Sequence, residues 1–235
     1  MIGIAIPACN EEEHIAAAVD AAWRAARHAG LNGRACMLVV ALDACTDATA
    51  ERAREAGAHT VELTAHNVGR ARALAAETLL AAGAQWLAFT DADTRVSPDW
   101  LFDQLSLNAD VVCGSVGVDD WSCHGADAAR LQAHFLATYS DRDGHRHIHG
   151  ANLGVSAAAY QRAGGFRQLD CSEDVDLVMS LEAQGASIAW SARPRVITSA
   201  RRHGRAIGGF ADALRAALPS SDWVAPLGLT VGQAP

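Results

Sequence analysis

Residues 86–94 read WLAFTDADT, in which a continuous apolar run, Trp86 to Phe89, is followed at once by Asp91 and Asp93. A short unbroken apolar run is typical of a strand that is buried on both faces of a sheet. Two carboxylates at positions i and i+2 of a turn can face one hard divalent cation such as Mg²⁺ or Mn²⁺. Such pairs are also common in ordinary turns, so the surrounding sequence has to decide between a metal site and a turn.

Strand-like and helix-like stretches alternate on the N-terminal side of this run. In chain order they are expected at 3–8, 11–29, 36–42, 46–56, 60–63 and 68–82. This alternation predicts an α/β fold, with a mostly parallel sheet and helices on both of its faces. Ligands bind such sheets beyond the carboxyl ends of the strands. We therefore expect one crevice to be lined by Asn10, Asp43, Asn67, Asp91 and Asp93.

The second half of the chain is less regular and contains two polar loops, at 117–125 and 140–149. Its patterns predict helices at 98–105, 126–139, 157–163 and 173–184, and strands at 110–116, 151–155 and 187–192.

The composition excludes several classes of protein. All nineteen cationic residues are Arg and the formal net charge is −8, whereas a duplex nucleic-acid binder presents a basic face. The absence of Lys excludes Schiff-base catalysis and the P-loop. The six cysteines form no Cys-x-x-Cys pair, so we expect reduced thiols. No apolar run is long enough to span a bilayer and no signal-peptide pattern is present, so we expect a cytoplasmic protein.

Seven short patches occur together along the chain. They read IPACNEE at 6–12, DACTDAT at 43–49, NVGRARA at 67–73, TDADT at 90–94, GANLGVS at 150–156, AGGF at 163–166 and SEDVDL at 172–177. With these patches in this order, the chain resembles the family-2 glycosyltransferases of the GT-A fold over roughly its first 200 residues. The resemblance implies a Rossmann-like sheet with a smaller mixed part on the acceptor side. It also implies inverting transfer of a sugar from a nucleotide diphosphate to a hydroxyl of a small molecule or glycan.

The resemblance implies a single domain over residues 1–215. Residues 1–115 would bind the nucleotide sugar, residues 116–215 would bind the acceptor, and residues 216–235 would form a tail. Contacts to the donor nucleotide are expected from Pro7, Ala8, Asn10, Glu11, Asp43, Asn67, Arg70 and Asp91. Asp43 would bind the base. The family often has two successive Asp here, where this chain has Leu42 and Asp43, and usually an aromatic residue in place of Cys9, so the nucleobase stays open.

Arg70 and Arg72 begin a predicted helix on the diphosphate side of this site. The planar guanidinium suits phosphate oxygens, and a helix N-terminus adds positive potential. The alternative for both residues, and for Arg72 in particular, is a solvated helix face.

The divalent cation, Mn²⁺ or Mg²⁺, is expected to bind Asp93 directly. Asp91 would contact the ribose, the metal or a metal-bound water. The segment Arg201-Arg202-His203 resembles the place where some family members supply a late basic group to the metal and diphosphate, and His203 is a candidate ligand there.

Inverting transfer requires a carboxylate that accepts the proton of the acceptor hydroxyl. The resemblance assigns this role to Asp174 and places Glu173, Trp121 and Asn152 on the acceptor side. Two alternatives remain: acidic residues are favoured in the first turn of any helix, and Trp121 could equally belong to the core.

Histidines alternate in His145-Arg146-His147-Ile148-His149, so an extended segment would place three imidazoles on one side and could bind zinc. A loop that closes over donor and acceptor is the alternative, and for His145 a polar surface loop is another. Two other functions also stay open, namely a donor-binding module without turnover and a sugar-nucleotide pyrophosphorylase. The Gly-rich, Lys-containing loop of the latter is absent. The sequence does not identify the donor sugar or the acceptor, and it does not determine the oligomeric state.

Overall fold

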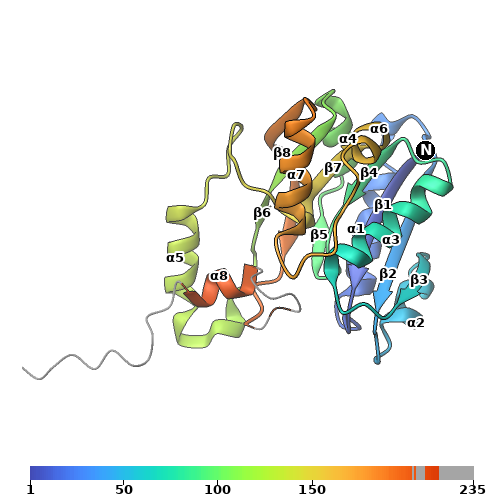
Figure 1. The fold of residues 1–235 in the computed structure, drawn as a ribbon. Coiled ribbons are helices and arrows are strands. Elements are labelled where there is room, and N and C mark those ends of the chain that lie inside the picture. Colours follow the sequence, from blue (N-terminus) through green and yellow to red (C-terminus); the bar gives the residue numbers. More distant parts are fainter. Residues whose placement is uncertain (203, 205–209, 217–235) are drawn as a thin grey trace, which may run out of the picture.

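The computed structural model describes residues 1–202, 204 and 210–216 (Figure 1). The candidate ligand His203 and nearly all of the expected tail lie outside these residues.

The described strands all belong to one sheet. They are β1 (Ile2–Ala8), β2 (Cys36–Asp43), β3 (His59–Leu63), β4 (Trp86–Phe89), β5 (Thr94–Val96), β6 (Val111–Gly117), β7 (Leu153–Ser156) and β8 (Ile188–Thr198). Their order across the sheet is β3-β2-β1-β4-β7-β6-β8-β5. The first four strands are mutually parallel, as expected, whereas β7 runs antiparallel to both β4 and β6. The sheet is therefore parallel on the N-terminal side and mixed on the other.

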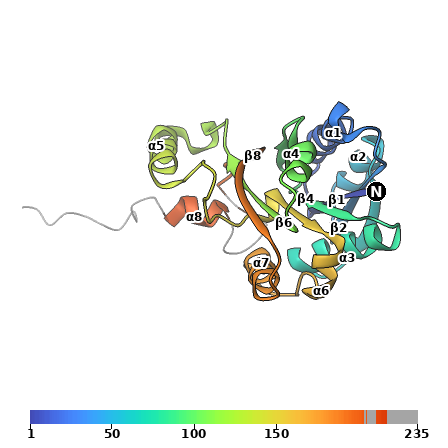
Figure 2. The ribbon, with the colours of Figure 1, turned by 90° about the horizontal axis from the view of Figure 1, so that it is seen from above.

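Helices cover both faces of the sheet (Figure 2). The α-helices are α1 (Ile15–Ala26), α2 (Thr49–Glu55), α3 (Val68–Ala81), α4 (Trp100–Ser106), α5 (Ala128–Thr138), α6 (Ala157–Arg162), α7 (Glu173–Ala183) and α8 (Phe210–Ala216). Short 3-10 helices are η1 (Ala29–Leu31), η2 (Ser122–Asp127) and η3 (Gly150–Asn152). Helices α1 and α4 lie on one face, and α3, α6 and α7 lie on the other.

The two faces are built from alternating residues of the same strands. In β1, Ile4 and Ile6 pack with α1 and α4, whereas Ala5 packs with α3. All three are completely buried, because a strand sends successive side chains to opposite faces and both faces are covered. The unbroken apolar runs in the sequence are a direct consequence of this double coverage.

The mixed half differs from the sequence expectations in two places. Strand β5 was not expected, and β8 extends to Thr198, well beyond the expected end at residue 192. This extension lets β8 pair with β6 beyond a register shift and with β5 at its end. Helices α5 and α8 pack together beside the sheet, around a small cluster that contains Trp121 and Leu131 (Figure 1).

Within the described part of the chain, none of the helices has the length and apolar character needed to cross a membrane.

Candidate active site

The Asp91-to-Asp93 turn lies between β4 and β5, at the edge of the sheet where the parallel strands end. The backbone N–H of Thr94 donates to the carbonyl of Asp91 at 3.1 Å and closes the turn. The turns that follow β1 and β2 end at the same edge, because these strands run parallel to β4 and β1. The parallel direction of these strands therefore brings the turns that follow them to one edge of the sheet.

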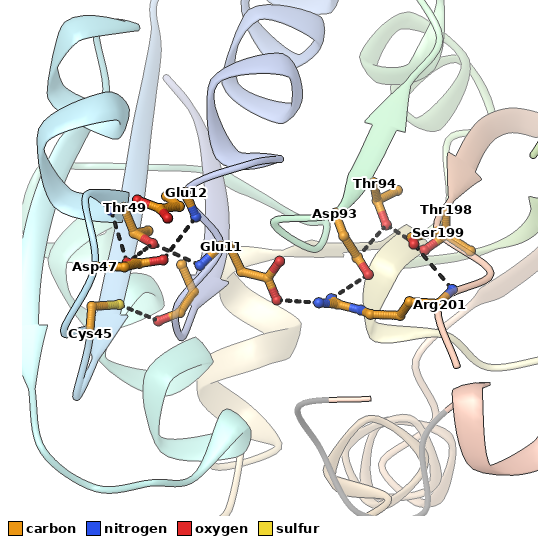
Figure 3. A network of polar contacts seen from close by, with 11 residues as sticks. Glu11, Glu12, Cys45, Asp47, Thr49, Asp93, Thr94, Thr198, Ser199 and Arg201 are labelled. Carbon is orange, nitrogen blue, oxygen red and sulfur yellow. Dashed lines mark hydrogen bonds and ion pairs between the residues drawn. The ribbon is translucent and has the colours of Figure 1, made fainter. Parts of the chain in front are cut away.

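A guanidinium bridges two carboxylates at this edge (Figure 3). Arg201 donates through Nη1 to Oε1 of Glu11 at 2.7 Å, and through Nη2 to Oδ2 of Asp93. The side chains of Glu11 and Asp93 are 4% and 11% exposed, and that of Arg201 is 25% exposed. Burial raises the pKa of the Asp93 carboxyl, and the positive charge of Arg201 opposes this rise. Arg201 is thus a local counterion for two largely buried acids.

A second guanidinium joins the Asp91 turn to α7. Arg72 donates through Nη2 to Oδ1 of Asp91 at 2.6 Å, and through Nη1 to Glu173. Burial raises the pKa of Glu173, against the opposing charge of Arg72. The Phe166 ring lies 5.8 Å from the guanidinium carbon. Because the Arg72 side chain is only 5% exposed, the expectation of a solvated helix face is wrong for this residue.

Arg70 and Asn67 have local partners at the start of α3. Arg70 pairs with Glu77 of the same helix at 3.0 Å, and both side chains are exposed. Asn67 is the N-cap residue: its Oδ1 accepts from the backbone N–H of Arg70 at 2.9 Å. Its Nδ2 donates to the carbonyl of Leu169 at 2.7 Å. The Asn67 amide therefore fixes both the beginning of α3 and the loop that precedes α7.

Asp43 anchors the loop between β3 and α3. Its carboxylate accepts three backbone N–H bonds, from Ala65 at 2.7 Å, His66 at 2.9 Å and Asn67 at 2.7 Å. The side chain is buried, and both of its oxygens take part. Sequence reasoning assigned this carboxylate to the nucleobase; the structure shows a loop-anchoring role that the pattern did not reveal.

The turns after β1 and β2 are joined by polar contacts that sequence reasoning also missed (Figure 3). The backbone N–H of Glu11 donates to the Thr49 hydroxyl at 2.7 Å, and that of Glu12 donates to Asp47 at 3.1 Å. Oδ1 of Asn10 accepts from the backbone N–H of Thr46 at 2.8 Å. These contacts hold the expected nucleoside-binding turn, which starts with Pro7 and Ala8 at the end of β1.

Asp174 lies in the first turn of α7 and is half-buried. Its Oδ2 accepts from the backbone N–H of Gly150 at 2.7 Å, and its Oδ1 accepts from that of Val175 at 2.8 Å. A Cβ at Gly150 would overlap the Arg72 guanidinium, so a larger residue here would displace that group from its acidic partners. The Asp174 side chain therefore connects α7 to η3, next to the ion pairs that Arg72 makes with Asp91 and Glu173.

Asn152 and Trp121, both expected on the acceptor side, are buried. The Asn152 amide accepts from Nε1 of Trp100 at 2.8 Å and donates to the carbonyls of Ser115 and Pro194 at 2.7 and 2.9 Å. With 0% exposure, its side chain has no surface for an acceptor and instead joins α4 to β6 and β8. Trp121 is 6% exposed and belongs to the cluster beside α5, which agrees with the alternative of a core role.

The His145-to-His149 segment forms a stack of rings. The rings of His147 and Tyr139 are 4.1 Å apart and nearly parallel, and the Tyr139 hydroxyl lies 3.0 Å from Nε2 of His149. Burial lowers the pKa of His149 to about 4. Among the residues that the structure describes, no group of three or more His, Cys, Asp or Glu side chains is arranged to hold a metal. The zinc hypothesis for this segment is therefore not supported. The expectation of a surface loop is wrong for His145, which is 4% exposed.

One sequence signal could have revealed the role of Arg72. Arg72 is in helical register with Ala75, Ala76 and Leu79, which form the buried face of α3. An arginine on an apolar face requires buried acidic partners.

Comparisons with known proteins agree with the fold. Residues 3–164 match the family model described as glycosyl transferase family 2. No curated protein matches the sequence. Among solved structures, S. aureus TarS 1–349 in complex with UDP-GlcNAc shares 15% identity at a TM-score of 0.61, over 89% of this chain and 61% of that one. M. tuberculosis glucosyl-3-phosphoglycerate synthase, in complex with Mn²⁺, UDP and phosphoglyceric acid, shares 18% identity at a TM-score of 0.56. The match covers 86% of this chain and 71% of that one. At these identities the likeness shows a common fold.

Proposed function

The chain belongs to glycosyl transferase family 2 and is a glycosyltransferase, and from this premise we propose that it transfers a sugar from a nucleoside-diphosphate sugar to a hydroxyl acceptor with inversion. The observation that carries the proposal is the Arg72 bridge between Asp91 and Glu173. This bridge holds the acidic turn of the donor side against the first turn of α7, which bears Asp174. The bridge would thereby keep the proposed donor side next to the candidate base, as a displacement reaction requires.

The donor nucleotide would lie along the carboxyl edge of the parallel strands. Pro7, Ala8, Asn10 and Glu11 border this edge from the first turn, and Asp91 borders it from the fourth strand. Asp43 and Asn67 shape the edge through the loops that they anchor, and Arg70 presents an exposed guanidinium near the start of α3. Uridine nucleotides are the first donors to test, because both solved relatives named above hold them.

The residues at the acidic turn fit a divalent cation. Asp91 and Asp93 offer carboxylate oxygens, which Mn²⁺ and Mg²⁺ prefer, and the raised pKa of Asp93 indicates a carboxylate that would gain from additional positive charge. When bound, such a cation would offset the negative charge on the leaving diphosphate. Asp93 would be the direct ligand, with Asp91 beside it.

Asp174 would be the general base. As the acceptor oxygen forms its bond to the anomeric carbon, the hydroxyl proton passes to the Asp174 carboxylate and the bond from that carbon to the diphosphate oxygen breaks. Two backbone N–H groups, from Gly150 and Val175, fix the carboxylate and leave further lone pairs for the proton. Glu173 would act indirectly, because Arg72 already engages its carboxylate.

A thermal-shift screen tests the proposal. Full-length protein is heated with UDP, GDP, TDP and CMP sugars, each with and without Mn²⁺. A nucleotide at about one hundred times its Kd should stabilise the protein by about 2.7 kcal/mol. Asp93→Ala should abolish the part of the shift that depends on the metal, measured against the melting temperature of the same variant without nucleotide. The donor-site assignment fails if none of these nucleotides raises the melting temperature with Mn²⁺ present.

An assay of sugar release to water and to hydroxyl acceptors then separates turnover from binding. Stable binding without any transfer or hydrolysis would indicate a donor-binding module in place of an enzyme.

A further inference from the structure

Arg201 contacts two acids that come from distant parts of the sequence. Glu11 follows β1 and Asp93 precedes β5, and they are 190 and 108 residues away from Arg201 along the chain. One guanidinium spans both carboxylates (Figure 3). Asp93 is also the residue that we propose as the direct ligand of the divalent cation. The guanidinium therefore already engages one of the two oxygens, Oδ2, that this ligand could offer to a cation.

A cation and this guanidinium cannot both lie against the Asp93 carboxylate without repulsion. Carboxylate oxygens bind Mg²⁺ at about 2.0–2.1 Å, and the Arg201 guanidinium donates directly to Oδ2 of the same carboxylate. The site has little water to screen like charges, because the Asp93 side chain is 11% exposed. Binding of the cation thus favours a new position for the Arg201 side chain.

We propose that Arg201 is an internal counterion that competes with the divalent cation for Asp93 until a diphosphate gives its guanidinium another anion to bind. The inference rests on the proposed donor site and adds an order of binding to it. The cation alone binds weakly, and the cation together with a diphosphate binds well. The coupling is reciprocal, so each ligand raises the affinity of the other by the same factor.

The structure around Arg201 allows its side chain to move away from Asp93 without a movement of the backbone. The last rung of the ladder between β5 and β8 pairs Thr94 with Thr198, and their hydroxyl groups are 2.9 Å apart. This rung fixes the backbone shortly before Arg201. The Arg201 side chain is more exposed than either of its acidic partners, so it can leave Asp93 towards solvent while the strand stays in place.

The test is a titration of full-length protein with Mn²⁺ alone, in which free Mn²⁺ is followed by electron paramagnetic resonance. Arg201→Gln removes the positive charge and should bind Mn²⁺ at least tenfold more tightly than the wild type. Arg195→Gln is the matched control, because Arg195 lies on β8 and pairs with Asp141 at the surface. This control should bind Mn²⁺ with wild-type affinity.

Two further variants locate the effect. Adding Asp93→Asn to Arg201→Gln should remove the gain in affinity, since the gain is assigned to the Asp93 carboxylate. Arg201→Lys keeps the charge, and its single ammonium cannot span both acids as the guanidinium does; its Mn²⁺ affinity should fall between those of the wild type and Arg201→Gln. It also serves as the folded comparison if Arg201→Gln loses stability.

The titration is repeated with inorganic pyrophosphate and with the nucleotide found in the thermal screen. Either compound should raise Mn²⁺ affinity by a larger factor in the wild type than in Arg201→Gln. Unchanged Mn²⁺ affinity in Arg201→Gln, or a gain that survives Asp93→Asn, would overturn the competition. The proposed function fails separately, when the wild type shows no nucleotide shift with Mn²⁺.

Discussion

Arg72 on α3 donates to Glu173 in the first turn of α7, and the two side chains, 101 residues apart in the sequence, are only 5% and 6% exposed. The other amino group of Arg72 binds Asp91. Arg72 therefore faces two acids, of which Glu173 is buried and Asp91 is 32% exposed. Such a network is strongly sensitive to the loss of Arg72, because the Glu173 charge then stays buried without compensation.

Arg72→Met should lower the free energy of unfolding by about 3–5 kcal/mol, since it leaves Asp91 and Glu173 without their partner. Arg70→Gln, two positions earlier on the same helix, removes only an exposed pair with Glu77 and should change stability by less than about 1 kcal/mol. Urea denaturation of both variants without nucleotide measures the difference. Equal effects would show that the Arg72 network adds nothing beyond a surface pair.

Asp174→Asn should bind the donor with near-normal affinity and lose roughly 10²- to 10⁴-fold in transfer rate, because the amide keeps the volume of the side chain but cannot accept the proton. Asp176→Asn is the control in the same helical turn, since Asp176 pairs with Arg167 at the surface. Single-turnover transfer measures both variants. Transfer within threefold of wild type in Asp174→Asn would move the base elsewhere and leave Asp174 with a structural role at the helix start.

Asp43→Asn distinguishes loop anchoring from recognition of the base. The amide can keep the bonds from Ala65 and His66 through one oxygen, but its NH₂ group cannot accept the bond from Asn67. A buried backbone N–H that loses its acceptor costs about 1–3 kcal/mol, so stability should fall even without nucleotide. Chemical denaturation of the nucleotide-free variant gives the result. Wild-type stability combined with weaker nucleotide binding would instead assign Asp43 to the base.

The stability of the fold should decrease between about pH 6.5 and pH 4 through His149. Burial lowers its pKa from 6.5 to about 4, so in this range the unfolded chain binds a proton that the folded protein does not. The stabilisation is complete above pH 6.5 and is lost progressively as the pH falls, by up to about 3 kcal/mol for this residue.

His149→Gln should flatten this dependence, as measured by urea denaturation at pH 7 and pH 5. His59→Gln, at an exposed position on β3, is the control and should keep the wild-type slope. An unchanged slope in His149→Gln would mean that other groups carry the pH dependence.

The parallel half of the fold could be predicted from the sequence because β1, β2 and β4 are mostly buried apolar runs. In addition, β1, β2 and β3 are each followed by a helix with its own periodicity. Ile4 and Ala5 illustrate this, since neither side of β1 meets solvent. Strand β5 could not be read, because three residues are too few to show a pattern. The end of β8 was missed because Arg193 and Arg195 interrupt its apolar run while they pair with Asp103 and Asp141 at the surface.

The candidate site was predictable in position but not in its pairings. The turns after parallel strands must meet at one edge, which places Asp91 and Asp93 there. The partners of these acids, Arg72 and Arg201, depend on which distant segments the tertiary structure brings together. Asn152 shows the same limit, because only the tertiary structure reveals that its amide makes all of these hydrogen bonds inside the core.

The position of β7 between β4 and β6 has a consequence for biosynthesis. The chain emerges from the ribosome with β1 to β4 first, and one edge of β4 stays without a partner until Leu153–Ser156 has been made. During that interval a completely apolar strand presents open N–H and C=O groups, a state that promotes pairing between nascent chains. The strand order therefore makes β4 a temporary sheet edge for as long as residues 90–152 are being synthesised.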